Sequence, residues 1–229
     1  ASTVRQTLDT NKVINDRVQL RFNAMLQDGE IAGRDSLKDD RKGAAMALRF
    51  KATDALTLEG NLSYTKIEQT PDWGVPYVNN EALGLVGPVT EFGVDRNTFY
   101  GVPGRDFQIA EETVATAKAT YEFDNGLTLT NTFRASESLN DYILTAPRRL
   151  IDNGSTNPEG WQAGLSFKSW NQETDVLANV LELSGDAEFA GATHKFVFGL
   201  AASQEKISKL GYSNLSSEDY EPPAGQRGC

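Results

Sequence analysis

Residues 16–27 read Asp-Arg-Val-Gln-Leu-Arg-Phe-Asn-Ala-Met-Leu-Gln, and apolar side chains alternate with polar ones along this stretch. One face would receive Val18, Leu20, Phe22, Ala24 and Leu26, and the other Arg17, Gln19, Arg21, Asn23, Met25 and Gln27. An α-helix would mix the two sets because its period is 3.6 residues, whereas a strand has a period of two. The stretch therefore predicts a β-strand with one face toward water and the other toward a core or lipid.

The same alternation recurs along the chain. Further strands are predicted at 3–9, 44–52, 56–65, 115–123, 127–135, 177–189 and 195–205. Two of the apolar faces carry a polar exception, Asn131 in one strand and Asn179 in another. No stretch has a helical period. We predict an all-β fold in which about eight long strands form an antiparallel up-and-down meander, as an open curved sheet that is part of a larger transmembrane β-barrel.

The connections between these strands alternate in length. Short turns are predicted at 10–15, 53–55, 124–126 and 190–193, and long loops at 29–42, 69–110, 139–174 and from 207 onward. Asp124-Asn125-Gly126 is a strong hairpin signal because Asn and Gly tolerate positive φ. Long structureless loops are uncommon in compact soluble domains. Short turns at one end and long loops at the other are typical of an outer-membrane barrel.

Composition narrows the class of protein further. The 229 residues would suit one or two soluble domains or part of a larger barrel. The formal net charge of −10 argues against a nucleic-acid partner, whose phosphates need Lys and Arg. No apolar run approaches the ~18 residues of a transmembrane helix. The chain could still cross a membrane with β-strands, because a transmembrane strand needs only ~9–11 alternating residues.

Several loop motifs form an ordered series along the chain. The segment from Asn23 to Asp35 has the pattern Asn-Ala-Met-x-Gln-Asp … Gly-Arg-Asp. In order along the chain follow Pro71-Asp72-Trp73-Gly74-Val75-Pro76-Tyr77-Val78, Phe99-Tyr100-Gly101, Arg105-Asp106-Phe107, the 124–131 hairpin, Thr145-Ala146-Pro147-Arg148, Asn171-Gln172-Glu173-Thr174-Asp175 and His194-Lys195. Each motif is weak alone, but their order and spacing over most of residues 1–206 are specific, and the series resembles TonB-dependent siderophore receptors of the catecholate-type branch.

The resemblance implies an architecture and a function. The family has a barrel of twenty-two strands around an N-terminal plug. Residues 1–229 are therefore expected to form a partial barrel domain, with the plug, its TonB box and the later strands outside this chain. The implied function is uptake of a ferric siderophore across the Gram-negative outer membrane, energised by TonB–ExbB–ExbD through the plug. Outer-membrane lipid is the expected surrounding, and iron is expected only as part of the ligand, with no cofactor.

The sequence contains no catalytic constellation. It has one histidine and one cysteine, and lacks a Gly-x-Ser-x-Gly motif and a glycine-rich phosphate loop. Carboxylate pairs such as Asp39-Asp40 and Glu111-Glu112 are most simply solvated charges. We therefore predict that the protein is not an enzyme and that it carries no metal site of its own.

The long loops contain the residue types that suit an anionic, aromatic iron chelate. Arg offers forked donors and stacks on rings, and Trp and Tyr offer flat faces and cation–π partners. Candidate ligand-binding residues are Arg34, Arg41, Trp73, Tyr77, Phe99, Tyr100, Arg105, Arg148, Arg149 and Trp161. The alternative for each is that it packs one loop against another.

The alternation also assigns charged residues to the inside of the barrel: Arg17, Arg21, Arg49, Lys51, Lys118, Arg134, Glu59, Glu122 and Glu182. They would contact the plug, or line a solvated wall. Cys229 is expected in an extracellular loop with a disulfide partner outside the chain, and an unpaired thiol is the alternative. A passive porin-type channel and a soluble all-β binding module are the competing functions.

Overall fold

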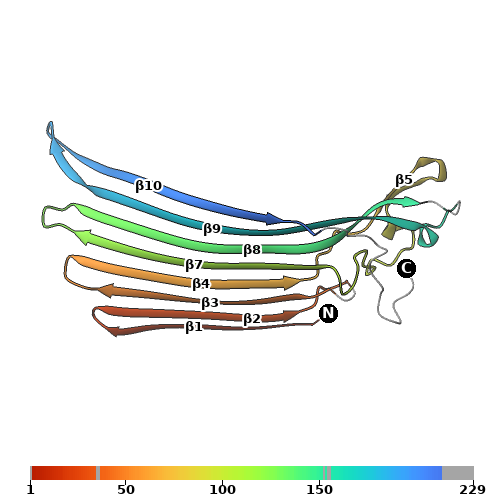
Figure 1. The fold of residues 1–229 in the computed structure, drawn as a ribbon, viewed down its shortest axis with the longest axis horizontal. Helices are drawn as coiled ribbons and strands as arrows, with labels where there is room; N and C mark the ends of the chain where they lie inside the picture. Colours follow the sequence, from red (N-terminus) through yellow and green to blue (C-terminus); the bar gives the residue numbers. More distant parts are fainter. Residues whose placement is uncertain (1, 35–36, 152, 154–155, 213–229) are drawn as a thin grey trace.

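Eight long strands form one antiparallel sheet in the computed structural model, which describes residues 2–34, 37–151, 153 and 156–212. The strands are β1 (Thr3–Asn15), β2 (Val18–Gly29), β3 (Asp39–Lys51), β4 (Leu56–Gln69), β7 (Phe107–Glu122), β8 (Thr128–Ile151), β9 (Gln162–Phe189) and β10 (Ala192–Leu210). Each strand is hydrogen-bonded to the next along the chain, as Figure 1 shows. The predicted up-and-down meander is therefore confirmed.

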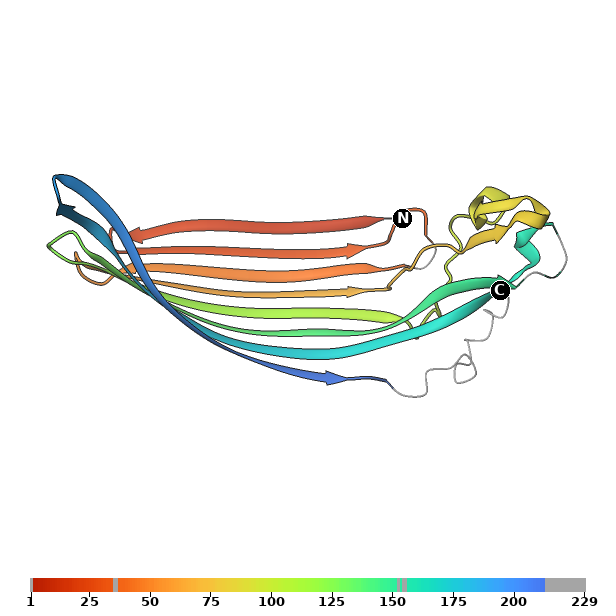
Figure 2. The ribbon, with the colours of Figure 1, turned by 90° about the horizontal axis from the view of Figure 1, so that it is seen from above.

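Shorter elements lie at one end of the sheet. They are the hairpin of β5 (Tyr77–Asn80) and β6 (Leu85–Pro88) and the 3-10 helices η1 (Glu81–Leu83), η2 (Val89–Phe92) and η3 (Pro158–Gly160). In Figure 2 the hairpin lies beyond the ends of β1 to β4 and over the extended end of β8. No helix among the described residues is long and apolar enough to cross a membrane. We call this end of the sheet the loop end and the opposite end the turn end.

Two predicted connections are wrong. The predicted loop at 139–174 is mostly strand, because β8 continues to Ile151 and β9 begins at Gln162. The predicted turn at 10–15 is strand too: β1 runs through Asn15, whose side-chain Oδ1 accepts hydrogen bonds from the backbone N–H groups of Arg17 and Val18, each at 2.9 Å. The turn thus lies at residues 16–17. Both errors come from stretches in which apolar and polar residues do not alternate.

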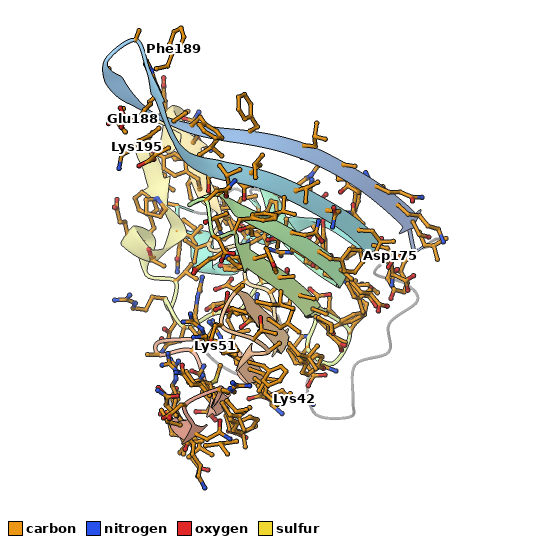
Figure 3. The ribbon with its side chains drawn as sticks, turned by 90° about the vertical axis from the view of Figure 1, so that its left-hand side faces the viewer. Lys42, Lys51, Asp175, Glu188, Phe189 and Lys195 are labelled. Atoms are coloured by element: carbon orange, nitrogen blue, oxygen red, sulfur yellow. The ribbon has the colours of Figure 1, made fainter. Side chains whose placement is uncertain are left out.

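The register of the sheet sorts side chains onto two faces. Figure 3 shows Lys51, Glu188 and Lys195 on the concave side of the curved sheet, and Lys42 and Asp175 on the convex side. The apolar residues of the alternating pattern, such as Leu58, share the convex side with Lys42 because cross-strand partners point to the same face. The concave side is polar, as expected for the inside of a barrel.

The apolar band of the convex face runs obliquely across the strands. One row of cross-strand partners consists of Leu8, Ala24, Ala44, Tyr64, Thr113, Glu137, Asp175 and Lys206. The row is mainly apolar on β1 to β4 and charged on β8 to β10. The band therefore shifts toward the turn end as the sheet proceeds, as it must if a flat membrane crosses tilted strands.

The hairpin turns show the same tilt. The row of partners that starts at Val18, the first residue of β2, reaches Leu181 on β9, eight residues before Phe189 ends that strand. The turns are thus displaced by more than one residue per strand. With ~3.3 Å per residue and ~4.8 Å between strands, this stagger corresponds to a strand tilt of about 40°, the value of transmembrane barrels.

The buried core lies outside the long, regular part of the sheet. The buried hydrophobic residues are Leu37, Val78, Val89, Ile143, Leu144 and Ala146, all at the loop end. On the convex face, large residues such as Leu62, Phe133 and Leu200 are exposed in the isolated chain. A wall that separates lipid from water has no dry interior, so a core forms only where loops pack on the strand ends.

Two asparagines pair with each other within the apolar band. Asn131 Nδ2 donates to Asn179 Oδ1 at 3.0 Å, and Asn179 Nδ2 donates back to Asn131 Oδ1 at 3.1 Å. The remaining amide hydrogens reach the backbone carbonyls of Val180 and Thr132 at 3.4 and 3.3 Å. The two polar exceptions to the apolar pattern therefore form one pair that joins β8 to β9. Because the two amides satisfy each other's hydrogen bonds, the pair is compatible with contact with lipid.

We predict that the substitutions Asn131→Leu and Asn179→Leu are strongly non-additive. Either one alone leaves an amide facing lipid without its partner, which costs about 1–3 kcal/mol of unfolding free energy. The double variant removes both amides and should be close to wild type. Denaturant unfolding of the complete receptor in liposomes measures the unfolding free energies of wild type, the two single variants and the double variant, which together form a double-mutant cycle. A double variant whose loss of unfolding free energy equals the sum of the two single losses would contradict this account.

Candidate functional site

Loops cover the concave side at the loop end. The β5–β6 hairpin contacts β8, and Trp73 and Arg105 of the same segment contact Lys168 and Phe167 of β9. Figure 2 shows the hairpin over the extended end of β8. Thr145 in β8 and Asp106 just before β7 are buried together with the apolar core residues. The loop end is therefore an ordered surface in which strand ends and loops jointly place side chains.

Arg34, a predicted ligand contact, joins two loops. Its Nε lies 2.7 Å from an oxygen of Asp72, and its Nη1 donates to the carbonyls of Arg96 at 2.9 Å and Thr98 at 2.8 Å. The side chains of Arg34 and Asp72 are only 15% and 18% exposed. The guanidinium thus holds the 30–38 connection against the 70–106 segment.

Arg105, another predicted ligand contact, also binds groups of the protein itself. Its Nε and Nη2 donate to Asp106 Oδ1 at 3.1 and 2.9 Å, and Nη2 also donates to the Thr145 hydroxyl. Its guanidinium lies 4.5 Å from the centre of the Phe167 ring. The side chain of Asp106 is 0% exposed and that of Arg105 13%. This buried ion pair connects the start of β7 to β8 and β9.

Two cation–aromatic pairs lie at the loop end of the sheet. Lys209 Nζ of β10 is 5.1 Å from the centre of the Trp170 ring of β9, and Lys168 Nζ is 5.6 Å from the centre of the Trp73 ring. Lys168, Trp170 and Lys209 share the polar, concave face because they continue the alternation of their strands. The pairs present ammonium groups and flat rings, the groups that an anionic aromatic ligand requires.

Sequence reasoning missed Lys168, Trp170 and Lys209 because it placed 139–174 in a loop and ended the last strand at residue 205. At the loop end β8 is covered by loops, and Ile143, Leu144 and Ala146 are buried close together, so hydropathy no longer alternates there. The stretch Gln162–Trp170 contains one Phe and one Trp, three residues apart, and its strand propensity is too weak a signal by itself.

The other predicted contacts are spread over the loop end. Arg41 on the concave face of β3 makes a two-point ion pair with Asp39, at 2.7 and 2.9 Å. Tyr77 and Arg148 are exposed, whereas Phe99, Tyr100 and Trp161 are half-buried. Arg149 belongs to β8, and its side chain lies outside the described part of the structure. Cys229 also lies outside the described residues.

A hollow of about 590 Å³ opens beside the Arg34 junction. It is lined by Ala32, Gly33, Arg34, Val75, Thr90, Val94 and Arg96. It lies between two loops, and the guanidinium of Arg34 at its edge is engaged by Asp72 and by the carbonyls of Arg96 and Thr98. The described residues include no group of three or more His, Cys, Asp or Glu side chains that could hold a metal ion.

Tyr212 ties the chain after β10 to the loop end. Its hydroxyl donates to both oxygens of Asp141, at 2.8 and 3.0 Å, and its ring meets Phe107 edge-on at 6.3 Å. Burial, and then the hydrogen bond to the Asp141 carboxylate, raises the pKa of the Tyr212 hydroxyl above its ordinary value. The hydroxyl therefore stays protonated and can continue to donate at neutral pH.

The polar concave face carries the charges that the alternation assigned to it. Lys118 and Glu59 are cross-strand partners with a 3.9 Å contact, and Arg21 pairs with Asp9 at 2.8 Å. Arg17 lies in the first turn rather than in a strand. These groups are well exposed, so they are open to water or to a further part of the protein.

Comparison with known proteins supports this architecture. The chain is 26% identical over 215 residues to the probable TonB-dependent siderophore receptor PiuA of Acinetobacter baumannii, covering 93% of this chain and 28% of that protein. It is 26% identical to the catecholate siderophore receptor Fiu of Escherichia coli K12, covering 93% and 29%. With the probable TonB-dependent receptor BfrD of Bordetella pertussis the identity is 28%, covering 97% and 29%. No family model matches the chain.

Solved structures agree with the sequence comparison. The open form of the ferric-catecholate import receptor Fiu superposes with a TM-score of 0.80 at 25% identity, covering 91% of this chain and 33% of that one. The siderophore receptor PiuA gives a TM-score of 0.75 at 27% identity, covering 90% and 29%. The ferripyoverdine receptor of Pseudomonas aeruginosa shares the fold at 18% identity, with a TM-score of 0.79.

The fold and its two faces define the chain as part of the wall of an outer-membrane receptor barrel. By sequence and structure together, it is similar to a segment of the barrel of TonB-dependent siderophore receptors, among them the catecholate receptor Fiu. The chain spans about three tenths of the length of the curated relatives it matches. The loop end is the extracellular end and the turn end the periplasmic one.

We predict that Arg105→Ala loosens the extracellular loops. The substitution leaves the buried Asp106 carboxylate without its cation, which costs about 3 kcal/mol or more of local stability. Limited proteolysis of the complete receptor should then cut the 70–106 segment faster. Arg148→Ala is the matched control, because Arg148 is exposed on β8, and it should leave the rate unchanged. Equal rates for Arg105→Ala and wild type would contradict this role of the ion pair.

Proposed function

We propose that the protein containing this chain takes up ferric siderophores across the outer membrane. The observation that carries the proposal is the combination of an oblique apolar band on the convex face with cation–aromatic pairs at the extracellular end of the concave face. The band fits lipid outside, and the pairs fit an anionic, aromatic ligand inside. Similarity to receptors named for catecholate siderophores supports the same ligand class.

The chemistry of ferric catecholates matches these pairs. Such complexes carry negative charge on oxygens that ligate iron, and their rings lie at the periphery. The ammonium groups of Lys209 and Lys168 can approach the oxygens, while Trp170 and Trp73 offer faces on which rings stack. Iron enters as part of the ligand, so the proposal requires no resident cofactor.

Energised transport needs parts outside the described sheet. β1 and β10 each pair with one neighbour only among the described strands, and their side chains are largely exposed. We propose that further strands of the same protein close the barrel there and that a plug occupies the concave side. Through that plug TonB–ExbB–ExbD would supply the energy. The exposed charges of the concave face, such as Lys118 and Glu59, would contact the plug.

We predict that Lys209→Ala and Trp170→Ala each lower uptake of iron-55 from its 2,3-dihydroxybenzoate complex by about five-fold, which is the effect of losing a contact of ~1 kcal/mol. Cells that express the receptor and lack their other iron receptors provide the assay. The matched control is Lys42→Ala, which removes the same charge from the convex face, away from the ligand and the plug. It should transport like wild type.

Three outcomes decide between the candidate functions. Uptake that ceases when TonB is deleted supports an energised receptor. Uptake that persists without TonB favours the passive porin-type channel instead. Recovery of the complete protein in the soluble fraction, rather than with outer membranes, would exclude both and leave the soluble binding module.

A further inference from the structure

A continuous set of contacts runs from the first extracellular loop to the wall of the sheet. It begins at Arg34, passes to Asp72, continues along the chain to Trp73 and ends at Lys168 on β9. These residues come from three separate segments of the chain. Arg34 therefore bears on the placement of Trp73 without contacting it.

The guanidinium of Arg34 has little capacity left for a ligand. Nε is engaged by Asp72 Oδ2 at 2.7 Å, and Nη1 by two backbone carbonyls within 2.9 Å. The backbone carbonyls of Arg96 and Thr98 fix the plane of the Arg34 guanidinium. The backbone of the 70–106 segment therefore sets the direction in which this guanidinium points toward Asp72. An arginine held in this way acts as a rigid junction between loops.

Asp72 connects the Arg34 contact to the position of Trp73, the next residue in the chain. One of its oxygens faces Arg34, and the other accepts the backbone N–H of Gly74 at 2.9 Å. Gly74 has a φ of 79°, the left-handed conformation that lets the chain turn tightly at this point. Trp73 is the residue between the two, so the turn that Asp72 closes decides where the indole points.

The indole of Trp73 stands at the entrance to the concave side. It is 55% exposed, which is unusual for so large an aromatic side chain. One neighbour that fixes it is the ammonium of Lys168, 5.6 Å from the ring centre. An exposed ring beside a cation gives a surface for an aromatic anion, but only if the loop holds the ring there.

We propose that Arg34 is a positioning residue, which acts through Asp72 to hold Trp73 against Lys168 and so forms one side of the ligand contact. Arg34 itself does not touch the ligand. This inference rests on the proposed function, since it assigns the part of the extracellular end that meets the siderophore. It also replaces the simpler expectation that every loop arginine binds the ligand directly.

The first experiment measures the placement of Trp73 without any ligand. The complete receptor is labelled with 5-fluorotryptophan in detergent, and the fluorine resonance of Trp73 is identified by its loss in Trp73→Phe. Arg34→Ala and Asp72→Ala should both shift and narrow this resonance, because the indole becomes mobile. Arg96→Ala removes an exposed arginine from the same loop, keeps the carbonyl that Arg34 uses, and should leave the resonance in place. An unchanged resonance in Arg34→Ala would overturn the proposal.

The second experiment measures binding of the iron(III) complex of 2,3-dihydroxybenzoate to the same variants. Arg34→Ala and Trp73→Ala should each weaken binding by about five-fold, the effect of losing one cation–π or stacking contact. The double variant should be no weaker than the weaker single variant, because both changes remove the same contact. Losses that multiply in the double variant, or a Trp73→Ala receptor that binds like wild type, would overturn the proposal.

The two experiments fail in different ways. A complete receptor that binds no ferric dihydroxybenzoate overturns the proposed function, and with it the ligand role of Trp73. The fluorine spectra would still decide whether Arg34 positions Trp73. Restored binding in Arg34→Lys would indicate that charge alone suffices and would overturn a role that depends on the forked geometry of arginine.

Discussion

The backbone of a chain that faces lipid must satisfy its hydrogen bonds within the protein, and the sheet depends on this constraint. The ladder runs through all eight long strands, each bonded to the next long strand along the chain. Side chains are then free to differ between the two faces. Apolar residues take the convex face and charged residues the concave face, where water or a plug can solvate them.

Strand tilt connects the register of this ladder to the membrane. Tilted strands make the turns step along the sheet and carry the apolar band with them, so that one row of partners begins as Leu8 and Ala24 and ends as Asp175 and Lys206. The reciprocal asparagine pair shows how a polar group can be kept in such a band, since each amide satisfies the other.

Above the lipid the same strands serve another purpose. β8 and β9 extend past their neighbours, and loops fold over these extensions to make the one buried core among the described residues. Two ion pairs, Arg34 with Asp72 and Arg105 with Asp106, stabilise this packing of loops on strand ends. The forked guanidinium that suits a siderophore suits carboxylates and carbonyls of the protein equally well. Lysines on the strand ends lie beside tryptophans instead.

The sequence by itself determined the strand meander, its two faces and the turn at Asp124-Asn125-Gly126, because a two-residue period and residues that accept positive φ are local properties. Only the tertiary structure decided where β8 and β9 end, since apolar and polar residues do not alternate where loops cover the strands. It also decided which loop arginines bind protein and which lysines reach Trp73 and Trp170. Those pairings join segments far apart in the chain, and their geometry follows from the register and the loop packing rather than from residue type.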